Sequence, residues 1–240
     1  MAIVEYWLVF VDTPGAPEQN FFDNTSLCWF APGEQVHSTS MEVFYVVQLS
    51  IWIVTCFSHR FVEARHKDYY QMYVHHIATI GLVAASWMCG YLRIGVLVLF
   101  IHDTSDVPLD LVKITNYLKI QGSRGLFVTE LIFVGNLVTW AYFRLFLYPT
   151  KCLYSALMES PIEINVSPED FAAMSLSDKI STSLSMPGHT LSNILLNVLL
   201  GLHIFWYYLL LRILYKLIVG KKAHKVGEEE YEGQSTDNDE

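Results

Sequence analysis

Two stretches decide how this chain folds: KDYYQMYVHHIATIGL at residues 67–82 and RIGVLVLFIHDTSD at residues 93–106. Each places ionisable side chains within or at the edge of an apolar run, His75-His76 in the first and Asp103-x-x-Asp106 in the second. Ionisable groups inside a hydrocarbon layer are costly, so they usually face a protein interior and serve a function. These four residues are therefore our candidate catalytic residues, a general base with an orienting acid. The alternative is that each is a satisfied polar contact between helices.

The composition indicates a membrane protein and argues against a soluble enzyme. Of 240 residues, 52% are hydrophobic and only 16% are charged, whereas a soluble domain carries about 25% charged residues. Most of the net charge of −9 comes from seven acidic residues in the segment 228–240, which has no Lys or Arg. Such a segment is too polar to bury a core. We predict a membrane domain at 1–222 and a disordered acidic tail at 223–240.

The apolar segments predict an all-α bundle of membrane-spanning helices. A membrane helix needs about 20 mostly apolar residues, and four segments qualify: 41–58, 72–92, 125–148 and 190–219. A fifth runs from Ile94 to about Tyr117 and contains the two acids, so its polar half must be hidden inside the bundle. Residues 2–11 are apolar but too short to cross. We expect them to be the end of an incomplete first helix, which gives five full spans and an N-terminal stub.

The connecting segments alternate in charge, and this alternation predicts the orientation. Segments 59–70, 113–124 and 212–225 hold eleven of the fifteen Lys and Arg residues, whereas segments 12–42, 90–93 and 149–188 hold three. The positive-inside rule makes the first set cytosolic, together with the C-terminus. Two Asn-x-Ser/Thr sequons, at Asn24 and Asn165, fall on the opposite side, where glycosylation occurs.

Helix geometry refines the candidate site. Residues 103, 106, 110, 113 and 117, all polar, are spaced by 3, 4, 3 and 4 and share one helix face, which predicts the lining of a cavity. The alternative for Asp110 and Lys113 is an ion pair at a solvated helix end. Pro108 should kink this helix. His75 and His76 point about 100° apart, so we expect one to act on the substrate while the other orients it or binds another group. Metal sites want three or four ligands; His102 is a candidate third, but we expect no metal.

The same residues resemble the Lag1 motif of ceramide synthases, the TLC-domain N-acyltransferases of the endoplasmic reticulum. The resemblance rests on 67–82, 93–106, Lys113 and Asn116-Tyr117. The flanks are similar too: Cys28-Trp29, Arg144 with Tyr148-Pro149, and LNVLLGLHIFWYYLLLRI at 196–213. It covers about residues 25–150 and 190–225.

The resemblance implies acyl transfer from acyl-CoA to a sphingoid base, giving a ceramide or dihydroceramide. It implies that His75, His76, Asp103 and Asp106 are essential, with one His as nucleophile or as base. Weaker substrate-binding candidates are Lys113, Asn116, Tyr117 and Arg144. The implied fold is a six-helix barrel around a lipid tunnel, here with its first helix truncated. The implied setting is the endoplasmic reticulum membrane. The implied partners are membrane lipids, acyl-CoA and sphingoid base, with no nucleic acid and no permanently bound cofactor. Homo- and heterodimers are left open. Thr236, in the acidic tail, is a candidate phosphorylation site.

This chain also departs from the family pattern. Pro108 and Asp110 stand where an aliphatic residue and a Glu are common, and the segment 149–189 is longer than expected. Chain-length preference therefore does not carry over. The alternative function is a catalytically silent TLC-type protein that senses or carries lipid, although such a protein has no chemical need for the His-His and Asp-x-x-Asp set.

Overall fold

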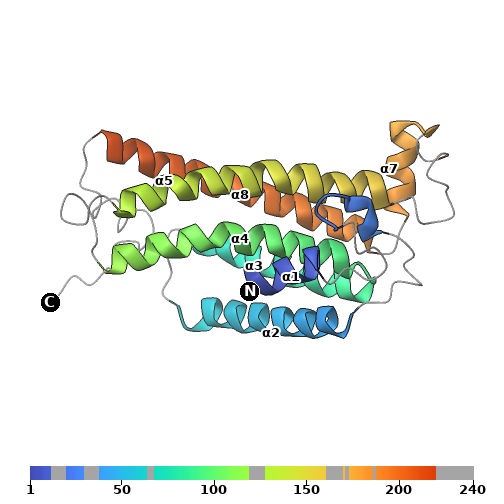
Figure 1. Ribbon diagram of the computed structural model, residues 1–240, viewed down its shortest axis with the longest axis horizontal. Coiled ribbons are helices and arrows are strands. Elements are labelled where there is room, and N and C mark those ends of the chain that lie inside the picture. The colour runs from blue at the N-terminus through green and yellow to red at the C-terminus, as the bar shows by residue number, and fades with distance from the viewer. Residues whose placement is uncertain are drawn as a thin grey trace.

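The computed structural model describes residues 1–11, 20–29, 38–63, 68–118, 128–160, 170, 173–185 and 188–219. Within these ranges the chain forms helices and turns and no strand. Figure 1 shows long helices lying side by side in an elongated bundle. In chain order they are α1 (Ala2–Phe10), η1 (Thr25–Cys28), α2 (Thr39–Phe61), α3 (Tyr69–Met88), α4 (Leu92–Tyr117), α5 (Val128–Trp140), η3 (Ala141–Leu153), η4 (Ser155–Glu159), α7 (Leu176–Leu184) and α8 (His189–Ile218). The acidic tail predicted at 223–240 lies outside the described residues.

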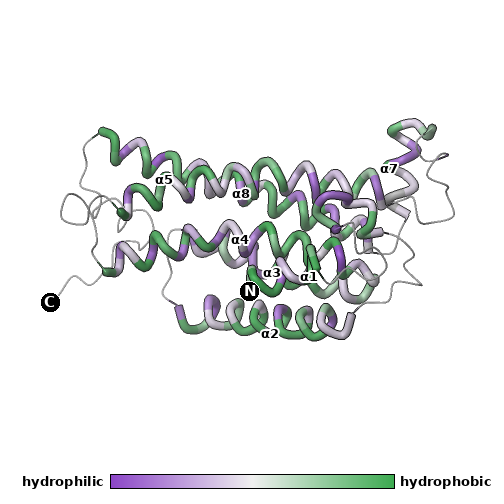
Figure 2. Tube along the Cα trace, in the orientation of Figure 1, coloured by the Kyte–Doolittle hydropathy of each residue, from purple (hydrophilic) through white to green (hydrophobic). Residues whose placement is uncertain are grey.

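The protein is a helical membrane protein. Three helical segments are long and apolar enough to cross a bilayer: Thr39–Phe61, Val128–Glu159 and His189–Ile218. Many large apolar side chains on α2, such as Ile53, Val54 and Phe57, are more than half exposed, and the hydropathy colouring in Figure 2 shows apolar residues along the outer helices. Lipid, rather than water, is the solvent that suits such faces. α3 and α4, with 20 and 26 residues, are also long enough to span but carry the polar residues of the site.

Most predicted segment boundaries agree with the helices to within a few residues. α3 and α4 are joined by a tight turn in which Gly90 has a φ of 77°, a left-handed conformation that favours glycine. In Figure 1 the end of α4, the start of α5 and the end of α8 lie at the same end of the molecule. The helix ends that border the Lys- and Arg-rich segments 113–124 and 212–225 therefore lie together. α4 continues as a helix through Pro108.

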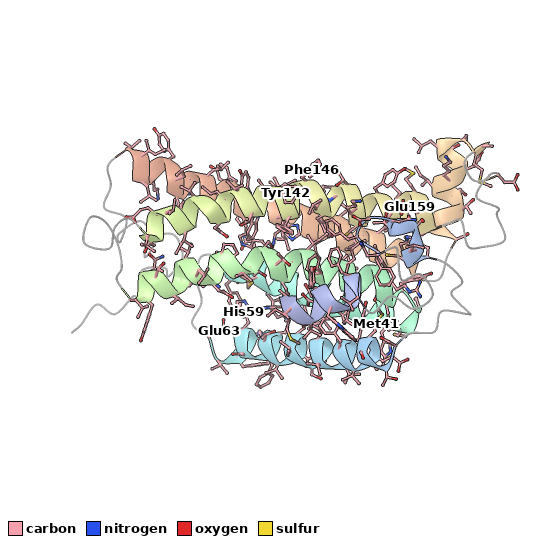
Figure 3. The ribbon with its side chains drawn as sticks, viewed as in Figure 1. Met41, His59, Glu63, Tyr142, Phe146 and Glu159 are labelled. Atoms are coloured by element: carbon pink, nitrogen blue, oxygen red, sulfur yellow. The ribbon has the colours of Figure 1, made fainter. Side chains whose placement is uncertain are left out.

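One predicted boundary is wrong: the helix that begins at Val128 does not end near Tyr148. It continues to Glu159, and residues Ala141–Leu153 form a π-helical stretch that contains Pro149. In a wider π-turn the amide bonds to the carbonyl five residues earlier, so the usual clash of proline with the carbonyl four residues earlier is relieved. Tyr142 and Phe146 project outward from this stretch (Figure 3), whereas Arg144 and Tyr148 are buried.

The core consists of two apolar clusters that meet at Leu202. The larger one joins α1, η1, α2, α3, α4, η3, η4 and α8, and includes the fully buried Tyr45 and Tyr148. The smaller one joins α4, α5 and α8 around Trp140 and Trp206. Leu202 packs against both clusters. The candidate polar residues lie near this junction, since Trp140 and Trp206 belong to the smaller cluster and contact them directly.

Candidate functional site

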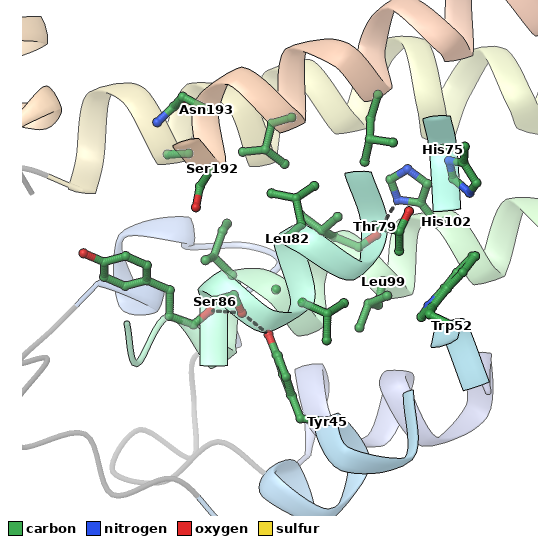
Figure 4. Close-up of a pocket in the computed structure, with 18 of the residues that line it drawn as sticks. Tyr45, Trp52, His75, Thr79, Leu82, Ser86, Leu99, His102, Ser192 and Asn193 are labelled. Atoms are coloured by element: carbon green, nitrogen blue, oxygen red, sulfur yellow. Dashed lines mark hydrogen bonds between the residues drawn. The ribbon is translucent and has the colours of Figure 1, made fainter. Parts of the chain in front are cut away.

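An elongated apolar pocket, called the channel below, lies inside the bundle. It encloses about 850 Å³ of space, its open mouth included. At one end it is lined by Trp52, His75, Asp106 and Arg144, and at the other by Trp29, Tyr91, His189, Ser192 and Asn193. Figure 4 shows His75, His102 and Trp52 grouped on one side of the channel and Ser192 and Asn193 on the other. Between them the walls are mainly aliphatic, supplied by Leu82, Val83, Val98, Leu99, Leu196 and Leu199. Such a channel suits a long hydrocarbon chain with its reactive group at the polar end.

The end of the channel at His75, here called the polar end, contains an ion pair in which the cation, Arg144, is buried and Asp106 is 40% exposed. The Arg144 guanidinium is 4% exposed, and its Nη2 donates to Asp106 Oδ1 at 2.5 Å. Its Nε donates to Ser105 Oγ at 2.7 Å, and its Cζ lies 4.1 Å from the centroid of the Trp140 ring. Taking a cation out of water is costly unless it is paired and hydrogen-bonded. These contacts meet that requirement and place a positive charge on the channel wall.

The two histidines of α3 take different positions. His75 lines the channel and His76 does not. The His75 ring lies 5.5 Å from the ring centroids of Trp52 and of Trp206, whereas His76 turns toward His59, with ring centroids 5.3 Å apart. The Nδ1 atoms of both histidines are buried and have no hydrogen-bond partner within the described ranges. Among the residues that the structure describes, no carboxylate is hydrogen-bonded to either imidazole, so the expected His–Asp pair is not formed.

The two acids of α4 also separate. Asp106 lines the channel with His75, whereas Asp103 does not. The Asp103 carboxyl instead lies against Glu5 of α1 and Gln48 of α2. The four predicted catalytic residues therefore do not converge on one point: the structure brings His75 and Asp106 to the channel and leaves His76 and Asp103 behind its wall.

Most of the predicted polar face of α4 lies away from the channel. The Lys113 Nζ donates to Asp110 Oδ1 at 3.1 Å, and both side chains are more than 60% exposed. Asn116 and Tyr117 are exposed as well. The ion pair that we gave as the alternative is what the structure contains. Of the four weaker substrate-binding candidates, Arg144 is the one that lines the channel.

A second histidine pair, His102 with His203, was not predicted. His102 Nδ1 is 2.6 Å from the carbonyl of Val98 and must donate to it. His102 Nε2 therefore accepts the hydrogen bond from His203 Nε2, at 2.9 Å. This bond ties α4 to α8 and leaves His102 without a free lone pair for the channel. His203 stands three residues before Trp206 in an apolar helix, and the shared helix face of these two residues was the signal available in the sequence.

Three channel-lining residues have polar groups with no hydrogen-bond partner in the described part of the chain. They are Trp52 Nε1, His75 Nδ1 and Thr79 Oγ1, all buried. Each such group in a folded protein needs an explanation. All three belong to the polar end, where a bound polar group would be positioned. Within the described part of the chain no group of three or more His, Cys, Asp or Glu residues is arranged to hold a metal ion.

The candidate modification sites are only partly covered by the structure. Asn24 is exposed, and its Oδ1 accepts hydrogen bonds from the backbone amide and the hydroxyl of Ser26. Asn165 and Thr236 lie outside the described residues. Glycosylation and phosphorylation at these positions stay predictions.

Comparison with known proteins identifies the family. A family model described as a TLC domain matches residues 3–212. The chain belongs to the TLC-domain family. Within the TLC-domain family it is similar to ceramide synthase hyl-2 of Caenorhabditis elegans, with 29% identity over 84% of this chain and 56% of the relative. It is also similar to ceramide synthase 1 LOH3 of Arabidopsis thaliana (30% identity, 88% of this chain, 67% of the relative) and to human ceramide synthase 5 (31%, 88%, 48%). The chain thus spans about half to two thirds of the length of these relatives.

Proposed function

We propose that this protein is a ceramide synthase: it transfers a fatty acyl group from acyl-CoA to the amine of a sphingoid base. The observation that carries the proposal is an aliphatic channel whose polar end holds His75 beside a buried arginine. The names of the relatives point to the same activity. Acyl-CoA acts as co-substrate, and we propose no permanently bound cofactor.

The position of His75 supports its assignment as the reactive residue. In one route an imidazole nitrogen of His75 attacks the thioester carbon, the carbon–sulfur bond breaks, and CoA leaves as a thiolate that takes up a proton. The amine then attacks the acyl-imidazole, releases a proton and restores the histidine. In the other route His75 removes a proton from the amine, which attacks the thioester carbon directly; the carbon–sulfur bond breaks, and the CoA thiolate leaves and takes up the proton from His75. Both routes place negative charge on the carbonyl oxygen, which the Arg144 cation on the channel wall can stabilise.

The remaining candidate residues take supporting roles in this proposal. Asp106 neutralises Arg144 and fixes the direction of its guanidinium. His76 packs against Trp52 and His59 and supports the position of His75. A polar substrate head bound between Trp52 and His75 can supply hydrogen bonds that these residues lack.

We further propose the arrangement in the membrane. The three apolar helices, together with α3 and α4, make five spans, and the short helix α1 adds a sixth element to a barrel around the channel. The polar end faces the cytosol, the C-terminus is cytosolic, and the membrane is that of the endoplasmic reticulum. The support is the bias of Lys and Arg toward the segments that follow α2, α4 and α8.

The test is expression of the chain in cells that lack their own ceramide synthases, followed by mass spectrometry of N-acyl sphingoid lipids. We expect product from the wild type and none from His75→Ala. The Asp110→Asn variant is a matched control on α4, since this side chain is 64% exposed and pairs with Lys113 away from the channel. Absence of product from well-expressed wild type would reject the proposal and favour a lipid-carrying or lipid-sensing protein.

A further inference from the structure

Three polar side chains form a buried cluster behind the channel wall. Glu5 of α1 is 0% exposed and Gln48 of α2 is 3% exposed. Gln48 Nε2 donates to Glu5 Oε1 at 2.9 Å. The Asp103 carboxyl lies in contact with the Glu5 carboxyl, and Glu5 Oε2 has no hydrogen bond of regular geometry. Each residue comes from a different helix, so the cluster joins α1, α2 and α4.

The location of this cluster separates it from the chemistry. None of its three members lines the channel. Asp103 follows His102 on α4, and a step of one residue turns the side chain by about 100°, away from the channel face. Two ionised carboxylates in contact would repel each other, so one of the two groups acts as a hydrogen-bond donor, a role that an amide also fills.

The cluster nevertheless lies one contact away from the reactive histidine. Gln48 is four residues before Trp52 on α2, and therefore one turn along the same face. Trp52 lines the channel, and its ring lies 5.5 Å from that of His75 and 5.8 Å from that of His76. On the other side, Asp103 is the neighbour of His102, which holds α4 to α8. Loss of the cluster would allow α2 to move and would release Trp52 from the two histidines.

We infer that Asp103 is a positioning residue: with Glu5 and Gln48 it fixes α1 and α2 against α4, and so holds Trp52 against His75. The inference rests on the proposed acyltransferase function for its activity test. It assigns the two acids of the Asp-x-x-Asp motif to different tasks, since Asp106 orients the channel arginine and Asp103 orients a helix. It also gives Glu5 and Gln48, which belong to no motif, a role in positioning Trp52 and His75.

The experiment compares amide and alanine substitutions. Asp103→Asn and Glu5→Gln keep the shape and can donate a hydrogen bond, so we expect kcat and KM within about threefold of wild type. Asp103→Ala and Glu5→Ala remove the contact, and we expect each to lower kcat at least tenfold with little change in the KM for acyl-CoA. The double alanine variant should be no worse than either single variant, because all three disrupt the same cluster. Asp110→Asn serves as the matched amide control, and His75→Ala defines the inactive level.

Thermal unfolding in detergent supplies a measurement that needs no substrate. The shifts in Tm caused by Glu5→Ala and Asp103→Ala should be strongly non-additive, whereas those of Glu5→Ala and Asp110→Ala should add. A loss of activity in Asp103→Asn equal to that of His75→Ala, with Glu5→Ala fully active, would overturn the inference and make Asp103 catalytic. Additive Tm shifts for Glu5 and Asp103 would also overturn it. If the wild type forms no product, the proposed function fails, while the unfolding cycle still decides whether the cluster exists.

Discussion

Removal of the Trp29 side chain should lengthen the acyl chain that the protein accepts. Along α3, the eleven residues from His75 to Ser86 correspond to about 16 Å, and along α4 the fifteen residues from Asp106 to Tyr91 correspond to about 22 Å. An extended carbon chain advances about 1.25 Å per carbon when its bonds are about 1.5 Å long. The channel therefore holds about 13 to 18 carbons beyond the reactive end. Trp29, which is 3% exposed, lines the far end.

The size of the effect follows from the space that removal of the indole opens. Trp29 packs edge-on against Tyr91, with ring centroids 5.4 Å apart, and so closes this end of the channel. An indole spans about 5 Å, so we expect Trp29→Ala to admit about four more carbons of about 1.25 Å each. Burial of each methylene is worth about 0.8 kcal/mol, and four of them would amount to about 3 kcal/mol. The ratio of kcat/KM for 20-carbon over 16-carbon acyl-CoA should therefore rise by ten- to about a hundredfold. The Trp29→Ala variant will also be less stable, because truncation of a core Trp to Ala lowers the free energy of unfolding by about 3–5 kcal/mol.

The assay presents a mixture of acyl-CoA species of 14 to 24 carbons to membranes that contain equal amounts of each variant. Mass spectrometry then gives the product distribution, which is independent of the total amount of folded enzyme. Trp87→Ala is the control, since Trp87 lies on α3, is 44% exposed and does not line the channel. The reasoning is refuted if Trp29→Ala yields the wild-type distribution, or if Trp87→Ala shifts it by the same amount.

Three further substitutions test the polar end of the channel. His75→Ala should lower product formation by at least a thousandfold. His76→Ala, outside the channel, should retain measurable activity. Equal losses in the same product assay would contradict the assignment of His75 as the reactive histidine. Arg144→Lys should lower kcat about a hundredfold, because one ammonium cannot contact Asp106, Ser105 and the Trp140 face together. Kinetics at saturating acyl-CoA measure this change. A kcat equal to that of the wild type would argue against a role for the guanidinium. His203→Leu should lower stability by about 1–3 kcal/mol through the unsatisfied His102, whereas His203→Gln, which keeps a donor, should lose less; chemical unfolding monitored by Trp fluorescence compares the two.

Helical periodicity and hydropathy were sufficient to predict the long helices but not the contacts between them. The polar residues in α4 marked it as a buried helix, although its apolar run before His102 is only eight residues long. Which of its faces meets the channel depended on packing against α1, α2 and η3. His102 and Asp106, four residues apart, line the channel, whereas Asp103, placed on the predicted face with Asp106, turns to Glu5. Spacing within one helix cannot select between neighbouring faces.

The π-helical stretch could not be predicted from the sequence, for a related reason. Tyr148-Pro149 is an ordinary stop signal for an α-helix, and nothing local distinguishes it from a proline that a wider turn accommodates. The consequence lies in the site, since Arg144 sits in this stretch and reaches Asp106 and Ser105 on α4. Wider turns alter the angle between successive side chains, so a change back to α-helical geometry would rotate Arg144 relative to Tyr148.

Two polar systems therefore hold the polar end of the channel, and they act on different walls. The His102–His203 bond and the Arg144–Asp106 pair connect α4 with α8 and η3. The Glu5–Gln48–Asp103 cluster connects α4 with α1 and α2. Since His75 Nδ1 has no hydrogen-bond partner among the described residues, the position of this ring depends on the rings of Trp52 and Trp206, one held from each wall. A substitution in either system should disturb the histidine from one side only, so variants from different systems should combine additively and variants within one system should not.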